Sequence, residues 1–155
     1  MLRILAAFIF FTRLPFWRLA EVPSEYFKNV VSRWALVGWL TAGLSVIVLY
    51  TVSLILPASV AVLLAIVTRL LITGCLHEDG LADFFDGFGG GTSRERILSI
   101  MKDSHIGSYG VIGLILYFAL LYTLLSSLPL TLAGSAILAG DPFSKGVSGM
   151  IINRL

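Results

Sequence analysis

The sequence predicts an all-α protein, a polytopic membrane helical bundle with about four transmembrane helices, an N-terminal interfacial segment and a cytoplasmic helix that carries an acidic motif. Three observations support this prediction. Hydrophobic residues make up 57% of the 155 residues and charged residues only 13%, far from the balance of a soluble domain. Long uncharged stretches have the length of membrane spans. Positive charge gathers before the first of these stretches.

The first long apolar stretch predicts a helical hairpin. Residues 35–68 contain no charged side chain. As one straight helix they would be about 51 Å long, well beyond a hydrocarbon core of about 30 Å, so the chain must turn. Pro57 divides the stretch, because proline interrupts a helix. We expect spans at about 35–56 and 58–76.

The second apolar stretch predicts two more spans. It is broken at Pro129, which places spans at about 106–128 and 130–152. The last of these contains Asp141 and Lys145, four residues apart and therefore on one helical face. Charged groups are costly in lipid, so we expect the two side chains to pair with each other.

The N-terminal region predicts the orientation of the chain. Residues 4–11 are apolar but too few to span a bilayer, and they lack the small-residue cleavage site of a signal peptide. An interfacial or re-entrant segment is expected there. The basic residues before the first span are Arg3, Arg13, Arg18, Lys28 and Arg33. The positive-inside rule then places the N-terminus and residues 77–105 in the cytoplasm, with 1–155 as a single domain of the inner cell membrane.

Charge and cysteine content exclude several classes of partner and site. The net charge is +2, without the basic excess of a nucleic-acid-binding surface. The single cysteine, Cys75, excludes an internal disulfide and a multi-cysteine metal site. The expected partners are therefore the lipid bilayer and small molecules, and not nucleic acid.

An acidic motif follows the second predicted span, at residues 77–87. Its aspartates Asp79, Asp83 and Asp86 are spaced i, i+4 and i+7 and share one face of a helix. They repel each other, and residues 70–93 contain no Lys or Arg to relieve the repulsion. Carboxylates in this arrangement suit Mg²⁺, which keeps water or substrate phosphates in its other positions. The alternative is a solvated acidic face without a metal.

The residues after the motif suggest a phosphate-binding region. A glycine-rich run at 87–91 is expected to end the helix, and it serves either as a phosphate cradle or as a plain linker. Thr92 with Glu95 forms a capping-box pattern for a helix over about 93–103. The cations of this helix are Arg94, Arg96 and Lys102. They are candidate phosphate ligands, with lipid headgroups as the alternative partner.

A third motif, residues 102–110, leads into the third predicted span. Asp103 is a candidate metal ligand or general base, although Asp103 and Ser104 are also typical helix caps. The Ser104 hydroxyl is available for hydrogen bonding, and Gly107 permits close approach of a ligand. For His105 a plain interfacial role is favoured over a catalytic one.

Three motifs in this order resemble the cobalamin synthase family, also called adenosylcobinamide-GDP ribazoletransferase. They are residues 11–15, residues 77–87 and residues 101–107, and the resemblance covers essentially the whole chain. It implies the reaction of adenosylcobinamide-GDP with α-ribazole or its 5′-phosphate, which forms adenosylcobalamin or its phosphate and releases GMP. Corrinoid and nucleoside substrates and a magnesium cofactor are implied with it.

The resemblance also implies roles for individual residues. Asp79, Asp83 and Asp86 would hold the metal against the pyrophosphate, with Asp86 also counted as catalytic. Asp103 would assist as a ligand or as the base for the attacking ribose hydroxyl. The implied substrate-binding positions are Arg13, Arg94, Arg96, Lys102, Ser104 and Gly107.

Family members usually continue through further membrane helices, so a short or truncated member is expected, and a homo-oligomer is one way to complete the bundle. Two other functions remain open. A lipid enzyme similar to CDP-alcohol phosphotransferases is suggested by Asp79, Gly80 and Ala82, although the later paired aspartates of that family are absent. An ion transporter or channel subunit would use Asp141 and Lys145.

Overall fold

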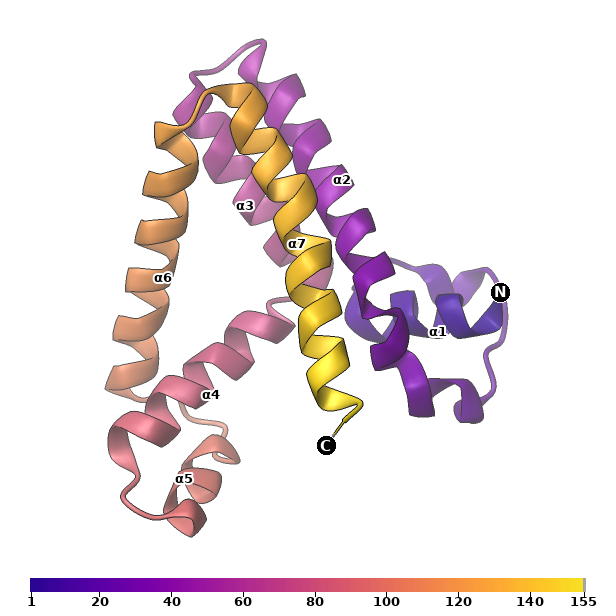
Figure 1. The fold of residues 1–155 in the computed structure, drawn as a ribbon, viewed down its shortest axis with the longest axis vertical. Helices are drawn as coiled ribbons and strands as arrows, with labels where there is room; N and C mark the ends of the chain where they lie inside the picture. The colour runs from indigo at the N-terminus through magenta and orange to yellow at the C-terminus, as the bar shows by residue number, and fades with distance from the viewer. Residues whose placement is uncertain (155) are drawn as a thin grey trace. The chain divides into compact units, whose positions relative to one another are not determined.

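The computed structural model describes residues 1–154 and consists of helices joined by short turns, with no strand among those residues (Figure 1). The all-α prediction is therefore confirmed. The helices in chain order are α1 Leu2–Phe11, η1 Phe16–Arg18, η2 Ser24–Arg33, α2 Trp34–Ser53, α3 Ala58–Thr73, α4 Leu76–Gly90, α5 Arg94–Met101, α6 Ser108–Ser127 and α7 Leu130–Ile152. The chain forms two compact units, Met1–Gly74 with Leu125 onward, and Cys75–Leu124.

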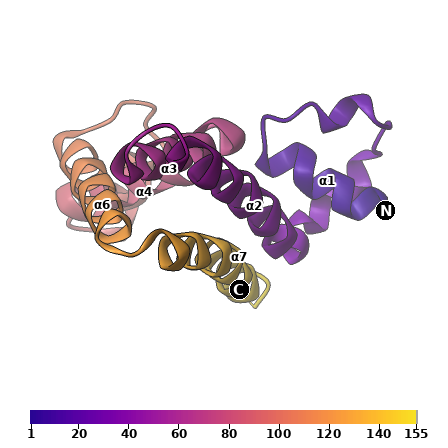
Figure 2. The ribbon, with the colours of Figure 1, turned by 90° about the horizontal axis from the view of Figure 1, so that it is seen from above.

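The first unit contains the hairpin predicted around Pro57. Helix α2 ends at Ser53 and α3 begins at Ala58, directly after Pro57. Proline suits a helix start because it lacks the backbone N–H that the first turn leaves unsatisfied. Pro129 precedes α7 in the same way. Helix α2 packs against both α3 and α7, and Figure 2 shows this group from above.

Small side chains line the buried face of α2. They are Gly38, Thr41, Ala42 and Ser45, at positions i, i+3, i+4 and i+7 of one helical face. A Cβ at Gly38 would overlap the backbone of Pro142 in α7, so the two helix backbones approach closely there. Close approach through small residues is the packing that membrane helices favour.

The N-terminal segment folds as the short helix α1, which packs against η2. Ala6 and Ala7 are almost fully buried, beside Val30 and Phe11. The ring of Phe11 stacks on Trp34 with ring centroids 5.0 Å apart. The predicted run therefore exists as a helix with a buried face, and its depth in a bilayer stays a prediction.

The second predicted span ends earlier than expected. Helix α3 stops at Thr73 because the next two residues have positive φ, 64° at Gly74 and 59° at Cys75. Left-handed backbone cannot continue a right-handed helix. The side chain of Arg13 covers Gly74 and leaves no room for a Cβ, while the Arg13 N–H donates to the Ile72 carbonyl at 2.7 Å.

The acidic helix ends within the glycine run, as predicted, but only near the end of that run. Helix α4 continues through the glycine run to Gly90. Gly87 lies against the Met101 side chain and Gly89 against the ring of Tyr109, and a Cβ at either glycine would overlap its neighbour. Tertiary packing thus outweighs the low helix propensity of glycine, which is about 1 kcal/mol per residue.

The next helix begins one residue later than the capping-box prediction. The Ser93 hydroxyl, not Thr92, accepts a hydrogen bond from the Arg96 N–H at 3.2 Å. Helix α5 then covers 94–101 instead of 93–103. Helix α6 follows from Ser108.

Two helical stretches within residues 1–154 are long and apolar enough to cross a membrane. They are Ser24–Ser53, which joins η2 to α2, and α6. Helices α3 and α4 pass the same test together, as one broken span. The structure therefore supports two to three membrane-crossing helices.

Candidate functional site

Helix α4 carries its aspartates on one face and aromatic rings on the opposite face. Asp79, Asp83 and Asp86 lie at i, i+4 and i+7 of this helix, so they share a face as predicted. Phe84 and Phe88 lie about half a turn away from them, with ring centroids 4.6 Å apart. The helix therefore presents a polar side and an aromatic side.

Asp86 joins α4 to the start of α6. Asp86 is only 7% exposed, and its carboxylate accepts the Gly107 N–H at 2.7 Å and the Gly110 N–H at 2.8 Å. A Cβ at either glycine would overlap the carboxylate. Backbone N–H groups in the first turn of a helix have no partner within that helix, so Asp86 satisfies donors that would otherwise be unpaired. Its observed contacts are those of a positioning residue.

The acidic face of α4 is electrostatically strained. The pKa of the Asp83 carboxyl is raised above its ordinary 3.8, first by partial loss of hydration and then by the negative charges of Asp79 and Asp86. Negative neighbours disfavour the ionised form. A bound cation would relieve this repulsion, and oxygen donors of this kind fit Mg²⁺.

The aspartates do not by themselves complete a metal site. No group of three His, Cys, Asp or Glu side chains within residues 1–154 lies close enough together to hold a metal ion. Mg²⁺ commonly takes one or two carboxylates and fills its other positions with water and substrate phosphates. Asp79 and Asp83 fit that limited requirement. Metal binding at these residues stays a prediction.

Asp103 and His105 form a hydrogen-bonded pair between α5 and α6. The Asp103 carboxylate accepts the His105 backbone N–H at 3.1 Å and bonds the ring Nδ1 at 2.6 Å. These hydrogen bonds lower the pKa of Asp103 and raise the pKa of His105. The sequence favours a plain interfacial role for His105. The structure adds a hydrogen bond to the Asp103 carboxylate that orients the His105 ring.

A polar cavity of about 360 Å³ lies among α4, α5 and the start of α6. Its walls include four predicted site residues, Asp86, Arg96, Asp103 and Gly107. His105 also lines it. The remaining wall residues are Gly90, Ser99, Ile100, Ile106, Ser108 and Tyr109. A guanidinium, a carboxylate–imidazole pair and hydroxyl groups are thus gathered around one hollow of the second unit.

The structure does not bring every predicted residue to this cavity. Arg94, Lys102 and Ser104 are exposed in the second unit and lie outside its wall. Arg13 belongs to the first unit, where its side chain covers Gly74. Tyr109 and Ser99 were not predicted as site residues, because no local sequence pattern shows which side chains of α5 and α6 meet.

The predicted pair in the last helix is present in the first unit. Lys145 and Asp141 form an ion pair with side chains only 4% and 8% exposed, and the Thr41 hydroxyl of α2 donates to the same Asp141 carboxylate. The three side chains tie α7 to α2. Because the opposite charges neutralise each other, the pair has a structural explanation.

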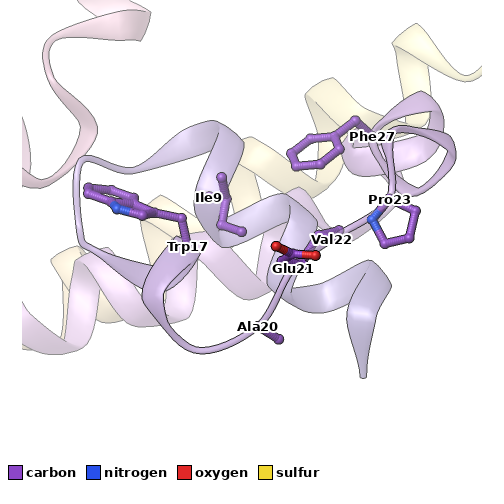
Figure 3. Close-up of a pocket in the computed structure, with 7 residues that line it drawn as sticks. All are labelled: Ile9, Trp17, Ala20, Glu21, Val22, Pro23 and Phe27. Carbon is purple, nitrogen blue, oxygen red and sulfur yellow. The ribbon is translucent and has the colours of Figure 1, made fainter.

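The first unit also contains an apolar pocket of about 550 Å³ beside α1 (Figure 3). Its walls are Ile9, Trp17, Ala20, Glu21, Val22, Pro23 and Phe27. Glu21 is the only charged side chain among them, and none of the predicted site residues lies in this wall. The polar cavity is therefore the better candidate for chemistry.

Comparison with known proteins places these observations in a family. The model of the cobalamin-5-phosphate synthase family matches residues 3–155. Adenosylcobinamide-GDP ribazoletransferase from Shewanella baltica (strain OS185) is 46% identical over 151 residues, which cover 96% of this chain and 58% of the relative. The proteins of the same name from Shewanella sp. (strain W3-18-1) and Shewanella sp. (strain ANA-3) are 46% and 44% identical over the same coverage.

The chain spans less than two thirds of the length of these curated relatives. No solved structure matches it.

Proposed function

This chain belongs to the cobalamin-5-phosphate synthase family, and on that premise we propose that it transfers the adenosylcobinamide phosphate moiety from adenosylcobinamide-GDP to α-ribazole or α-ribazole 5′-phosphate. The reaction releases GMP and forms adenosylcobalamin or its phosphate. The observation that carries this proposal is the polar cavity, because its wall combines Arg96, the Asp103 and His105 pair and the Asp86 carboxylate of α4.

Asp79 and Asp83 are the residues that would hold magnesium, together with the more buried Asp86. The pKa of Asp83 is raised by partial loss of hydration and then by the charges of Asp79 and Asp86, and the second of these causes supports the assignment because like charges favour a cation. Bound magnesium would offset negative charge on the pyrophosphate of the donor. Asp86 keeps Gly107 and Gly110 in place through its two hydrogen bonds.

His105 is the proposed proton acceptor for the ribose hydroxyl, with Asp103 as its orienting partner. The lowered pKa of Asp103 makes that carboxylate a weak base on its own. Imidazole titrates nearer neutral pH, which suits general-base catalysis. The Asp103 contact at Nδ1 leaves Nε2 as the ring atom that would receive the proton. The hydroxyl oxygen then forms the new bond to phosphorus as the bond to GMP breaks.

Arg96 is the proposed ligand of phosphate oxygens, since it lines the cavity and a guanidinium binds phosphate in a bidentate manner. Arg94 and Lys102 are exposed on the same segment and are proposed to attract the negatively charged donor. Ser104 and Gly107 remain proposed substrate contacts. Arg13 has a structural explanation in its contact with Gly74.

In the proposed membrane arrangement, α2, α3, α6 and α7 are four spans of the inner cell membrane. The N-terminus and the acidic helix lie on its cytoplasmic side. Basic residues before α2 support this orientation. The buried Asp141 and Lys145 pair supports a membrane position for α7, because it removes the penalty of two separate charges. A homo-oligomer remains part of the proposal.

A GMP-release assay tests the proposed activity. Purified protein in detergent or liposomes is incubated with adenosylcobinamide-GDP, α-ribazole and Mg²⁺, and GMP is measured by chromatography. We expect GMP release that stops with a chelator and returns with added Mg²⁺. Absence of release from protein with intact helical circular dichroism would refute the proposal. Release that persists with chelator would refute the metal assignment alone.

A further inference from the structure

A second hollow of the second unit is almost entirely apolar. This aromatic groove, of about 350 Å³, lies between α4 and α6 and is defined here by Phe84, Phe88, Gly89, Tyr109, Ile112 and Gly113. The side chains of Phe84, Phe88 and Tyr109 are 46%, 60% and 54% exposed. Large aromatic rings thus remain available for contact along the groove.

Two glycines give the groove its flat walls. The ring of Tyr109 lies directly over Gly89, and the ring of Phe85 lies directly over Gly113, so that a Cβ at either glycine would overlap the ring. Phe88 stacks at a tilt on Phe84, with ring centroids 4.6 Å apart. Aromatic rings that remain partly exposed can bind other flat aromatic molecules through stacking.

The groove and the polar cavity share one wall residue. Tyr109 lines both hollows, and the neighbouring glycines Gly89 and Gly90 line the groove and the cavity respectively. A ligand with a flat apolar end in the groove would therefore place its polar end beside Asp103 and His105. A nucleoside acceptor has these two ends, because its aromatic base is flat and apolar and its ribose is polar.

We propose that the aromatic groove binds the base of the acceptor nucleoside, a fused aromatic ring with few hydrogen-bonding groups, such as a benzimidazole. This inference rests on the proposed function. Among the defining residues only Tyr109 has a polar side chain, so the polar edge of guanine in the donor would lose hydrogen bonds to water without replacing them. A benzimidazole has a single free ring nitrogen as acceptor and therefore loses fewer hydrogen bonds than guanine does.

The decisive variant is Phe88→Ala, with Phe143→Ala as the matched control. Phe143 is an exposed phenylalanine of α7 in the first unit, 73% exposed, and it lies outside the groove. We expect Phe88→Ala to raise the KM for α-ribazole about tenfold, because each base stacked on an aromatic ring contributes at that scale. The KM for adenosylcobinamide-GDP should change less than about twofold, and Phe143→Ala should change neither. Phe88→Tyr should restore the KM for α-ribazole.

Other outcomes would overturn the proposal. An unchanged KM for α-ribazole in Phe88→Ala excludes the groove as the base site. An increase confined to the KM for the donor assigns the groove to guanine. A change only in the dependence of rate on lipid composition assigns it to a lipid acyl chain.

A binding measurement separates this inference from the proposed activity. Equilibrium dialysis with labelled α-ribazole, in the absence of donor, requires no turnover. If wild-type protein binds α-ribazole about tenfold more tightly than Phe88→Ala does, as stacking predicts, the groove assignment stands even where GMP release fails. Equal binding by the two proteins overturns the groove assignment even where GMP release is normal.

Discussion

Asp141 in the first unit lies between a lysine and a threonine hydroxyl, with only 8% of its side chain exposed. Asp83 in the second unit instead experiences the negative charges of Asp79 and Asp86. The first carboxylate is neutralised within its own unit, whereas the second is destabilised by its neighbours. The charge that ties α7 to α2 is compensated within the protein, whereas the Asp83 charge lies beside like charges and would be compensated by the proposed magnesium.

The largest expected effect comes from breaking the compensated pair. Lys145→Met should reduce the free energy of unfolding by about 3–5 kcal/mol, because Asp141 is then buried without its cation. Thermal unfolding in detergent measures the change. The double variant Asp141→Leu, Lys145→Met should recover most of the stability. A Lys145→Met protein as stable as the wild type would show that the ion pair does not stabilise the packing of α7 on α2.

The next effect concerns the buried carboxylate of the second unit. Asp86→Ala should destabilise the start of α6 by about 2–4 kcal/mol, because the N–H groups of Gly107 and Gly110 lose a charged acceptor. Hydrogen exchange of residues 103–110 should become faster. Asp79→Ala, at an exposed residue of α4, serves as the control and should leave exchange unchanged. Equal exchange in both variants would contradict the positioning role of Asp86.

Asp83→Asn should separate activity from stability. We expect GMP release to fall at least about 100-fold, since a proposed metal ligand is removed. The raised pKa of Asp83 means that folding disfavours its charge, so stability increases as the pH falls through that pKa. At neutral pH without Mg²⁺ the asparagine variant should therefore unfold at a slightly higher temperature. Full activity in this variant would remove Asp83 from the site.

The smallest effect is a shift in the titration of His105. The raised pKa of His105 means that the protonated imidazole pairs with the Asp103 carboxylate below that pKa, and that this pairing is lost as the pH rises through it. The lowered pKa of Asp103 keeps its carboxylate ionised at pH values below its ordinary pKa of 3.8. Asp103→Asn should return the His105 pKa toward 6.5. NMR can follow this change, with His77→Gln to assign the only other histidine. An unshifted titration would show that the pair does not form.

Features set by spacing along the chain were predictable from the sequence. The four-residue interval between Asp141 and Lys145 was enough to predict their pairing, and Pro57 was enough to predict the hairpin. The shared face of the aspartates also follows from helical geometry alone. In each case one local rule decides the structure.

Features set by distant neighbours were not predictable from the sequence. Gly87 and Gly89 remain helical because Met101 and Tyr109 pack on them. The helix propensities of neighbouring residues cannot predict that contact. The orientation of His105 toward Asp103 depends on the turn between α5 and α6. The aromatic groove likewise requires rings and glycines from two helices.

The two hydrogen bonds of Asp86 also bear on how this protein tolerates changes in length. They close loops of 21 and 24 residues that contain all of α5. The entropy of closing a loop changes slowly with its length, by about 0.6 kcal/mol per doubling. Insertions in the turn between α4 and α5 should therefore be accepted readily. An insertion of one residue between Gly107 and Gly110 would misalign both donors, so that short segment should keep a fixed length.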